Sequence, residues 1–139
     1  MIVLLVAAVA TVVVDVTTKQ LVIAVLAEGR LYALAPGWGV RRVDNQRGAL
    51  GRVPVWQVAL LWVAWVGIVL VCVRLSSAQP NTLTAVGLGM AMGGAGGNVV
   101  DRIRRGAVID FVAAGPWPVF NLADAAMVIG ALMAAVSVV

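Results

Sequence analysis

The chain has 139 residues, of which 63% are hydrophobic and only 12% are charged. Its mean hydropathy is +1.05, and a chain this apolar has too little polar surface to cover a water-soluble globule. The length fits a single membrane-embedded domain, residues 1–139, and excludes a second, soluble domain. The net charge of +4 lies in short segments between apolar runs, which favours phospholipid headgroups over nucleic acid as the counter-charge.

Four apolar stretches are long enough for membrane-spanning helices, which need about 20 residues each. They cover residues 2–26, 53–73, 82–100 and 119–139. The first stretch lacks the basic start and the small-residue cleavage site of a signal peptide, so we expect it to be retained. The sequence therefore predicts an all-α integral membrane protein, a bundle of four transmembrane helices with both termini on one side.

Three connections join the predicted spans. The first, residues 27–52, contains Tyr32 and Trp38, aromatic residues that favour the headgroup layer, and it could contain short β-strands. The second, residues 74–81, is a short polar turn, and the third, residues 101–118, is charged and ends in a proline-rich stop. Because successive spans alternate in direction, the first and third connections lie on the same side of the membrane.

Small residues repeat along the third and fourth predicted spans. Gly89, Gly93 and Gly97 recur every four residues, so one face of the third span is reduced to backbone and allows a close helix contact. The fourth span carries small residues at the same period, centred on Gly130. We expect these two spans to touch.

The acidic residues gather on the side of the first and third connections. An ionisable side chain at membrane depth is costly unless it is paired or hydrated, so such residues indicate a functional site. There are six of them: Asp15, Glu28, Asp44, Asp101, Asp110 and Asp124.

The residue types present exclude several hydrolytic mechanisms. The chain has no histidine, and its one cysteine, Cys72, lies deep in an apolar run, so Ser-His and Cys-His nucleophiles cannot form beside the acids. Zinc hydrolysis lacks its usual imidazole and thiolate ligands. Two neighbouring carboxylates remain: one can activate a water as general base while the other donates a proton to the carbonyl oxygen.

Two of the acids have a basic residue on the same helix face. Lys19 follows Asp15 by four positions, and Arg105 follows Asp101 by four positions, a spacing that permits ion pairs. Asn98 falls on the same face as Asp101. For both acids, an ion pair that fixes a helix end is as reasonable an interpretation as catalysis.

Asp110 and Asp124 have no basic residue within four positions. Their charge is not compensated locally, so we predict that they form the catalytic pair. Asp124 also falls in the first turn of a helix whose N-cap would be Asn121, a position where backbone N–H groups favour a carboxylate. Asp110 considered alone would be a solvated loop residue.

Four sequence blocks around the predicted spans resemble a known family. In order and spacing they are similar to the signature blocks of lipoprotein signal peptidase, also called signal peptidase II. The resemblance covers the whole chain, and it implies an aspartic endopeptidase that needs no metal or organic cofactor. The substrate implied is a diacylglyceryl-modified prolipoprotein, cut just before its lipidated cysteine. The blocks are Asp15-Val-Thr-Thr-Lys19, Gly93-Gly-Ala-Gly-Gly-Asn98-Val-Val-Asp101-Arg102, Val108-Ile-Asp110-Phe111 and Phe120-Asn-Leu-Ala-Asp124.

By position, the resemblance implies that Asp110 and Asp124 are the catalytic aspartates. One block departs from the family pattern, because the segment from Asn45 to Leu50 has an extra residue and lacks the family's aromatic residue. This departure affects the role of Asn45 and the shape of the substrate-facing loop more than catalysis. The supporting polar residues implied are Asp15, Lys19, Asn45, Asn98, Asp101, Arg102 and Asn121.

The resemblance also implies a location in the bacterial plasma membrane, with both termini cytoplasmic and the site near the extracytoplasmic surface. The positive-inside rule alone predicts the reverse, because basic residues beside the acids outnumber Arg74 on the other side. We follow the family, and we expect a monomer that contacts membrane lipid and no nucleic acid.

Two other functions stay open at this point. A small four-span transporter could use Asp15 to bind protons or cations, although this leaves the blocks around Asp110 and Asp124 unexplained. An inactive relative could bind lipoproteins without cutting them, a hypothesis motivated by the irregular block at Asn45.

Overall fold

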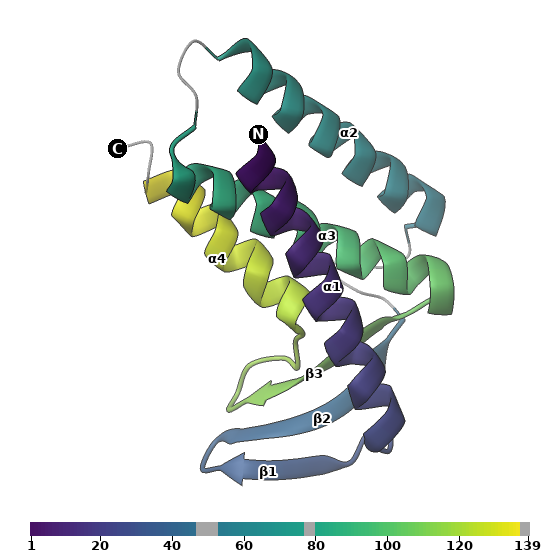
Figure 1. Ribbon diagram of the computed structural model, residues 1–139. Helices are drawn as coiled ribbons and strands as arrows, with labels where there is room; N and C mark the ends of the chain where they lie inside the picture. Colours follow the sequence, from purple (N-terminus) through teal and green to yellow (C-terminus); the bar gives the residue numbers. More distant parts are fainter. Residues whose placement is uncertain (47–52, 77–79, 137–139) are drawn as a thin grey trace.

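The computed structural model describes residues 1–46, 53–76 and 80–136. Helices lie side by side, and a small sheet lies at the end of the bundle opposite the N-terminus and the C-terminal end of the last helix (Figure 1). The elements are α1 (Ile2–Val25), β1 (Leu31–Ala35), β2 (Trp38–Asn45), α2 (Val55–Leu75), α3 (Thr82–Arg105), β3 (Val108–Ala114) and α4 (Leu122–Val136).

Three helices, α1, α2 and α3, are long and apolar enough to cross a membrane, and α4 is a shorter apolar helix. Large apolar side chains such as Val9, Leu60 and Ile68 are exposed, as expected where lipid surrounds a helix. The chain is therefore a multi-pass membrane protein. A fourth span over residues 119–139 stays a prediction, because α4 has 15 described residues and residues 137–139 lie outside the described part.

The third helix is longer than the sequence predicts. The apolar run ends near residue 100, whereas α3 continues to Arg105 and is capped by Gly106 at a φ of 70°, a left-handed conformation that glycine adopts readily. Asp101 and Arg102 therefore belong to the last turns of α3 and not to the connection that follows it. This extra length carries them to the level of the sheet.

Glycines let α3 pack closely on two neighbours at once. An added Cβ at Gly89 or Gly93 would overlap backbone atoms of α1. A Cβ at Gly87 would likewise overlap the backbone of Gly130 in α4. The predicted contact between the third and fourth helices is thus confirmed. It runs through Gly87, however, while the row that begins at Gly89 packs against α1.

The sheet is antiparallel with the order β1-β2-β3. Strands in the first connection agree with the prediction, but β3 comes from the third connection and was not predicted, so the all-α class is too narrow. Val43 of β2 pairs with Asp110 of β3, which places Asp110 on a strand and not in a loop. Ile109 and Phe111 are buried against Val22 of α1, and this contact fixes the sheet to the end of the bundle.

Helix α2 stands apart from the other three helices (Figure 1). Val58 and Val73 are its buried residues. Trp62 crosses to α3, where its Nε1 donates a hydrogen bond to the carbonyl oxygen of Met92 at 3.1 Å. Its ring lies over Gly96, whose missing Cβ would approach the ring to 3.0 Å. The indole therefore spaces α2 from α3 and leaves a pocket under the sheet.

Candidate active site

Two asparagine side chains hold Asp110 on β3. Asn45 donates from Nδ2 to Asp110 Oδ2 at 3.0 Å, and Asn121 donates from Nδ2 to Asp110 Oδ1 at 2.7 Å. Burial raises the pKa of Asp110 above its ordinary value of 3.8, the two amide hydrogen bonds and the charge of Lys19 lower it, and the charge of Asp124 raises it. The net shift is upward, so Asp110 keeps its proton to a higher pH than a solvated aspartate.

Asp124 lies in the first turn of α4, as predicted. The Oδ1 atom of Asn121 accepts a hydrogen bond from the Asp124 N–H at 2.9 Å, and Asp124 Oδ2 accepts one from the Asn121 N–H at 3.3 Å. This reciprocal arrangement is a capping box, which satisfies backbone donors that the first helical turn leaves open. Asp124 Oδ1 accepts a further bond from Asn98 Nδ2 of α3 at 2.8 Å. The carboxylate is thus oriented from two elements.

Asn121 connects the surroundings of the two aspartates. Its side chain is fully buried, and its Nδ2 donates to Asp110 Oδ1 and also to Asn98 Oδ1 at 3.1 Å. Its backbone N–H and its Oδ1 serve Asp124. One asparagine therefore contacts both acids, and amides rather than cations fill the space around them.

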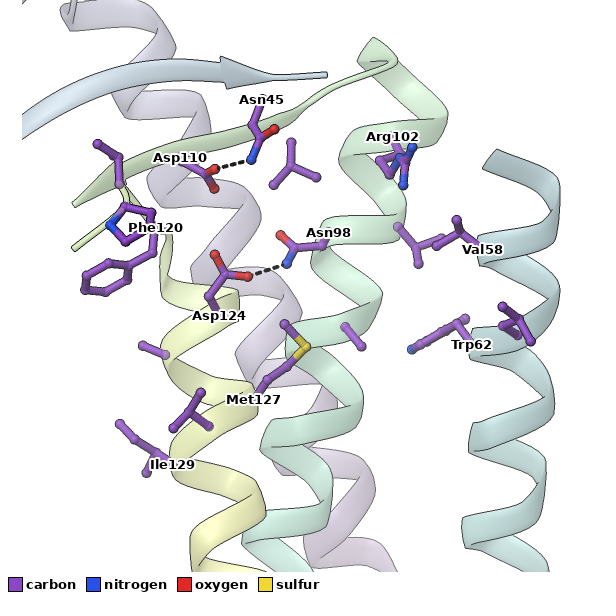
Figure 2. A pocket seen from close by; sticks show the side chains of 18 of the residues that line it. Asn45, Val58, Trp62, Asn98, Arg102, Asp110, Phe120, Asp124, Met127 and Ile129 are labelled. Carbon is purple, nitrogen blue, oxygen red and sulfur yellow. Dashed lines mark hydrogen bonds between the residues drawn. The ribbon is translucent and has the colours of Figure 1, made fainter. Parts of the chain in front are cut away.

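Both aspartates line one pocket of about 970 Å³. Figure 2 shows Asp110 and Asp124 at the same end of this pocket, one from β3 and one from α4, with Asn45 and Asn98 beside them. Apart from Arg102, the remainder of the wall is apolar and comes mainly from α2, α3, α4 and the segment 117–120. Its members include Val58, Leu61, Trp62, Trp65, Met127, Val128 and Ile129. A polar end with two acids thus opens onto a long apolar space.

A second polar cluster lies behind the pocket, centred on Lys19. The Nζ of Lys19 lies 2.7 Å from Asp15 Oδ2 and 2.9 Å from Asp101 Oδ2, and it donates to Asn98 Oδ1 at 2.8 Å. Arg105 completes the charge balance, because its Nη1 lies 2.6 Å from Asp101 Oδ1. The predicted ion pairs of Asp15 and Asp101 are both present, and neither acid lines the pocket.

Arg102 and Asn45 complete the polar part of the pocket lining. Arg102 lines the pocket, and its Nη2 donates to the carbonyl oxygen of Val53, just before α2, at 3.3 Å. Asn45 is the last residue of β2. The rest of the irregular block, residues 47–50, lies outside the described residues. Of the acidic residues singled out in the sequence, Asp110 and Asp124 line the pocket and Asp15 and Asp101 belong to the cluster around Lys19. Asp44 pairs with Arg42 on β2 instead, and neither Asp44 nor Glu28 lines the pocket.

This arrangement is suited to acid–base chemistry on a water molecule. Neither Asp110 nor Asp124 forms a salt bridge with any residue that the structure describes. No group of three or more His, Cys, Asp or Glu side chains in the described ranges could hold a metal ion. Two carboxyl groups at one pocket end can divide the roles of proton acceptor and proton donor.

The sequence itself matches a described family over nearly its whole length. A family model for signal peptidase (SPase) II matches residues 7–139. The chain belongs to the signal peptidase II family. The family resemblance seen in the four sequence blocks is thereby confirmed.

Individual relatives in the signal peptidase II family agree with this assignment. A lipoprotein signal peptidase from Rhodococcus jostii (strain RHA1) is 37% identical over 125 residues, which are 86% of this chain and 63% of that protein. One from Burkholderia mallei (strain SAVP1) is 36% identical over 127 residues, which are 86% of this chain and 76% of that protein. This chain thus spans just under two thirds of the Rhodococcus relative.

Solved structures match the fold as well. A structure described as a bacterial membrane enzyme superposes with a TM-score of 0.82 at 25% identity, covering 98% of this chain and 92% of the other. A second has a TM-score of 0.83 at 25% identity, covering 97% and 86%. The helices and the small sheet of this chain are therefore shared with a known membrane enzyme.

The apolar wall of this pocket was not identified from the sequence. Trp62 and Ile129 sit within the apolar runs 58–73 and 125–136, so hydropathy alone cannot separate residues that face a pocket from residues that face lipid. A tryptophan in the middle of a span was the available signal, since tryptophan usually gathers at the membrane surface. In this site it reaches α3 instead.

Proposed function

We propose that this protein is a membrane aspartic endopeptidase that removes the signal peptide from diacylglyceryl-modified prolipoproteins, cutting just before the lipidated cysteine. The observation that carries the proposal is the pair Asp110 and Asp124 at the polar end of one apolar pocket, joined through Asn121. Membership of the signal peptidase II family supports the substrate class.

In the proposed reaction, ionised Asp124 takes a proton from a water molecule, whose oxygen attacks the scissile carbonyl carbon. Protonated Asp110 donates its proton to the carbonyl oxygen, which gives a tetrahedral intermediate. Collapse of this intermediate breaks the C–N bond: Asp124 gives the proton that it took from water to the leaving nitrogen, and Asp110 regains a proton from a hydroxyl of the intermediate. The products are a carboxylate on the signal peptide and a free amine on the lipidated cysteine. The raised pKa of Asp110 supports its assignment as the proton donor.

The pocket wall fits a substrate that carries lipid. Leu61, Trp65 and Ile129 offer an apolar surface to acyl chains or to an apolar signal segment, and the acids lie where that surface meets the sheet (Figure 2). A substrate anchored in the membrane would present its scissile bond at this depth. Binding energy along the apolar wall would then be used to orient the peptide bond at the acids.

We propose a plasma-membrane protein with both termini in the cytoplasm and the sheet at the extracytoplasmic surface. The sheet lies at the end of the bundle opposite the start of α1 and the end of α4 (Figure 1). This supports a location of both termini on one side of the membrane and of the sheet on the other. We also propose that the protein acts as a monomer, in contact with membrane lipid and not with nucleic acid.

Neither alternative function gains an observation in its favour. A transporter would need Asp15 to titrate along a path, but this carboxylate is 1% exposed and ion-paired with Lys19. An inactive relative would be expected to lose the surroundings of Asp110 and Asp124, yet these retain hydrogen bonds from three asparagines.

The test is cleavage by the purified protein in lipid or detergent. We expect it to cut a diacylglyceryl prolipoprotein and not to cut the same precursor when the lipid is absent. Mass spectrometry should identify the new N-terminus as the lipidated cysteine. Binding without cleavage would identify the inactive relative instead.

A further inference from the structure

The three charged residues at the centre of the cluster around Lys19, namely Lys19, Asp15 and Asp101, are buried and are not used by the proposed reaction. Lys19 and Asp101 are 0% exposed and Asp15 is 1% exposed. The ammonium group of Lys19 contacts both carboxylates and the side-chain oxygen of Asn98, so its three N–H donors have three acceptors. These three side chains are held rigidly, because each is buried from solvent and paired within the group.

Each carboxylate of this cluster also accepts a backbone hydrogen bond from a distant element. Asp15 Oδ1 accepts from the N–H of Ala123 at 3.0 Å, and Asp101 Oδ2 accepts from the N–H of Ile109 at 3.3 Å. Ala123 directly precedes Asp124, and Ile109 directly precedes Asp110. The two acids that pair with Lys19 therefore hold the main chain one residue before each aspartate of the pocket.

We propose that Asp15, Lys19 and Asp101 form a backbone clamp that sets the separation of the two catalytic aspartates. This inference rests on the proposed function of Asp110 and Asp124. The three residues are positioning residues: they line no part of the pocket and they act through the main chain of α4 and β3.

The fold places the two aspartates on different elements, and the clamp connects the main chains of these elements. Asp110 lies on a strand and Asp124 on a helix, so their separation depends on contacts between the two main chains, of which the bridge between Val112 and Phe120 is one. Asn121 links the side chains, whereas the clamp links the backbones. Lys19 fixes the distance between its two carboxylates, each carboxylate fixes one N–H, and each N–H fixes the residue that follows. Displacements of about 1 Å at reacting groups can reduce rates by roughly 100-fold.

Matched substitutions separate this role from that of charge alone. Asparagine at position 15 or 101 removes the negative charge but keeps an oxygen that can accept the backbone N–H. Leucine has a similar size and removes both the negative charge and the acceptor oxygen. We therefore compare D15N with D15L and D101N with D101L, using purified protein and a diacylglyceryl prolipoprotein. Asp44, which pairs with Arg42 on β2, provides the control pair D44N and D44L.

We expect the leucine variants to lose roughly 100-fold in kcat and the asparagine variants to stay within about tenfold of the parent. KM should change little in all four, because none of the altered side chains contacts the pocket. Equal losses in kcat for asparagine and leucine would overturn the clamp, and so would parental kcat in the leucine variants. Parental activity in D110N or D124N would instead overturn the proposed function itself, which keeps the two failures distinguishable.

Backbone amide exchange gives a second readout should a leucine variant not fold. By NMR, the N–H groups of Ala123 and Ile109 should exchange slowly in the parent and in the active asparagine variants. Fast exchange of both amides in a variant with parental kcat would refute the clamp. Selective loss of protection, at Ala123 in position-15 variants and at Ile109 in position-101 variants, would support it.

Discussion

Asparagines, and not basic side chains, hold the two aspartates that line the pocket. Asn45 and Asn121 donate to Asp110, and Asn98 donates to Asp124. An amide orients a carboxyl group without adding a positive charge, whereas an adjacent lysine or arginine would favour the ionised form of each acid. The arrangement thus lets one of the two acids keep a proton, which acid–base catalysis by a carboxyl pair requires.

The hydrogen bond from Asn45 should tune the acid of the pair. Burial raises the pKa of Asp110 and the Asn45 hydrogen bond lowers it, so N45A should raise this pKa further. If protonated Asp110 is the donor, activity falls as the pH rises through its pKa. The falling limb of the pH–rate profile should therefore move to higher pH in N45A, measured as kcat against pH.

A neighbouring acid provides the control for this shift. Asp44 precedes Asn45 on β2 but pairs with Arg42, so D44A should leave the falling limb where it is in the parent. A limb that stays in place in N45A, or moves to lower pH, would contradict the assignment of Asp110 as proton donor.

At the scale of elements, α3 carries the contacts that organise the site. Its glycines admit α1 and α4, and its last three turns carry Asn98, Asp101 and Arg102 toward the sheet. Gly97 belongs to the same row, and its missing Cβ makes room for the carboxylate of Asp15. Close helix packing and the placement of the polar cluster are therefore one structural feature.

An alanine at position 97 tests this link. Its Cβ would lie 2.5 Å from Asp15 Oδ2, so G97A should displace that carboxylate and destabilise the fold by about 1–3 kcal/mol, the usual cost of overpacking. Thermal unfolding in detergent measures the loss of stability, and the cleavage rate should fall with it.

The matched control lies on α2. No atom lies within 4 Å of the Cβ that an alanine would add at Gly67, so G67A should keep or slightly increase stability, because alanine favours helix over glycine. Equal stability of G97A and the parent would show that the position of the Asp15 carboxylate does not depend on the missing Cβ of Gly97.

The sequence predicts these elements unevenly, for physical reasons. Long apolar runs define α1 and α2 almost to the residue, because hydropathy reports burial in lipid directly. The apolar run of the third helix ends before Asp101, whereas α3 continues to Arg105, because charged residues can also form helix. Gly106 was the better end signal. The sequence does not predict strand β3, although Val108–Ala114 is a short, mostly apolar run between Gly106 and Gly115, since periodicity does not distinguish a strand of this length from a buried helix segment.

The site was more predictable than the elements that carry it. The absence of a nearby cation singled out Asp110 and Asp124, and the structure places both in one pocket without a salt bridge among the described residues. The hydrogen bonds that Asp15 and Asp101 accept from backbone N–H groups of α4 and β3 could not be predicted, because they join residues distant in sequence and leave no local pattern.

At the scale of the whole molecule, the separation of α2 from α3 and α4 creates the apolar space next to the acids. Trp62 bridges this space and lines it. If the space receives the apolar part of the substrate, W62A should raise KM roughly tenfold, which corresponds to the loss of about 1.4 kcal/mol of apolar contact, while kcat changes less. Steady-state kinetics with the lipidated precursor measures both values.

Trp56 is the matched control on the same helix. It is 63% exposed and does not line the pocket, so W56A should leave KM close to that of the parent. A larger rise in KM for W56A than for W62A would place the lipid-binding surface elsewhere.

The central claim is that two uncompensated aspartates at one end of the pocket perform hydrolysis together. Single-turnover cleavage of a diacylglyceryl prolipoprotein by D110N, D124N and the control D44N tests it most directly, with folding of each variant checked by thermal unfolding. The account predicts no detectable cleavage by either pocket variant and a parental rate for D44N. Parental cleavage by a folded D110N or D124N variant would contradict it.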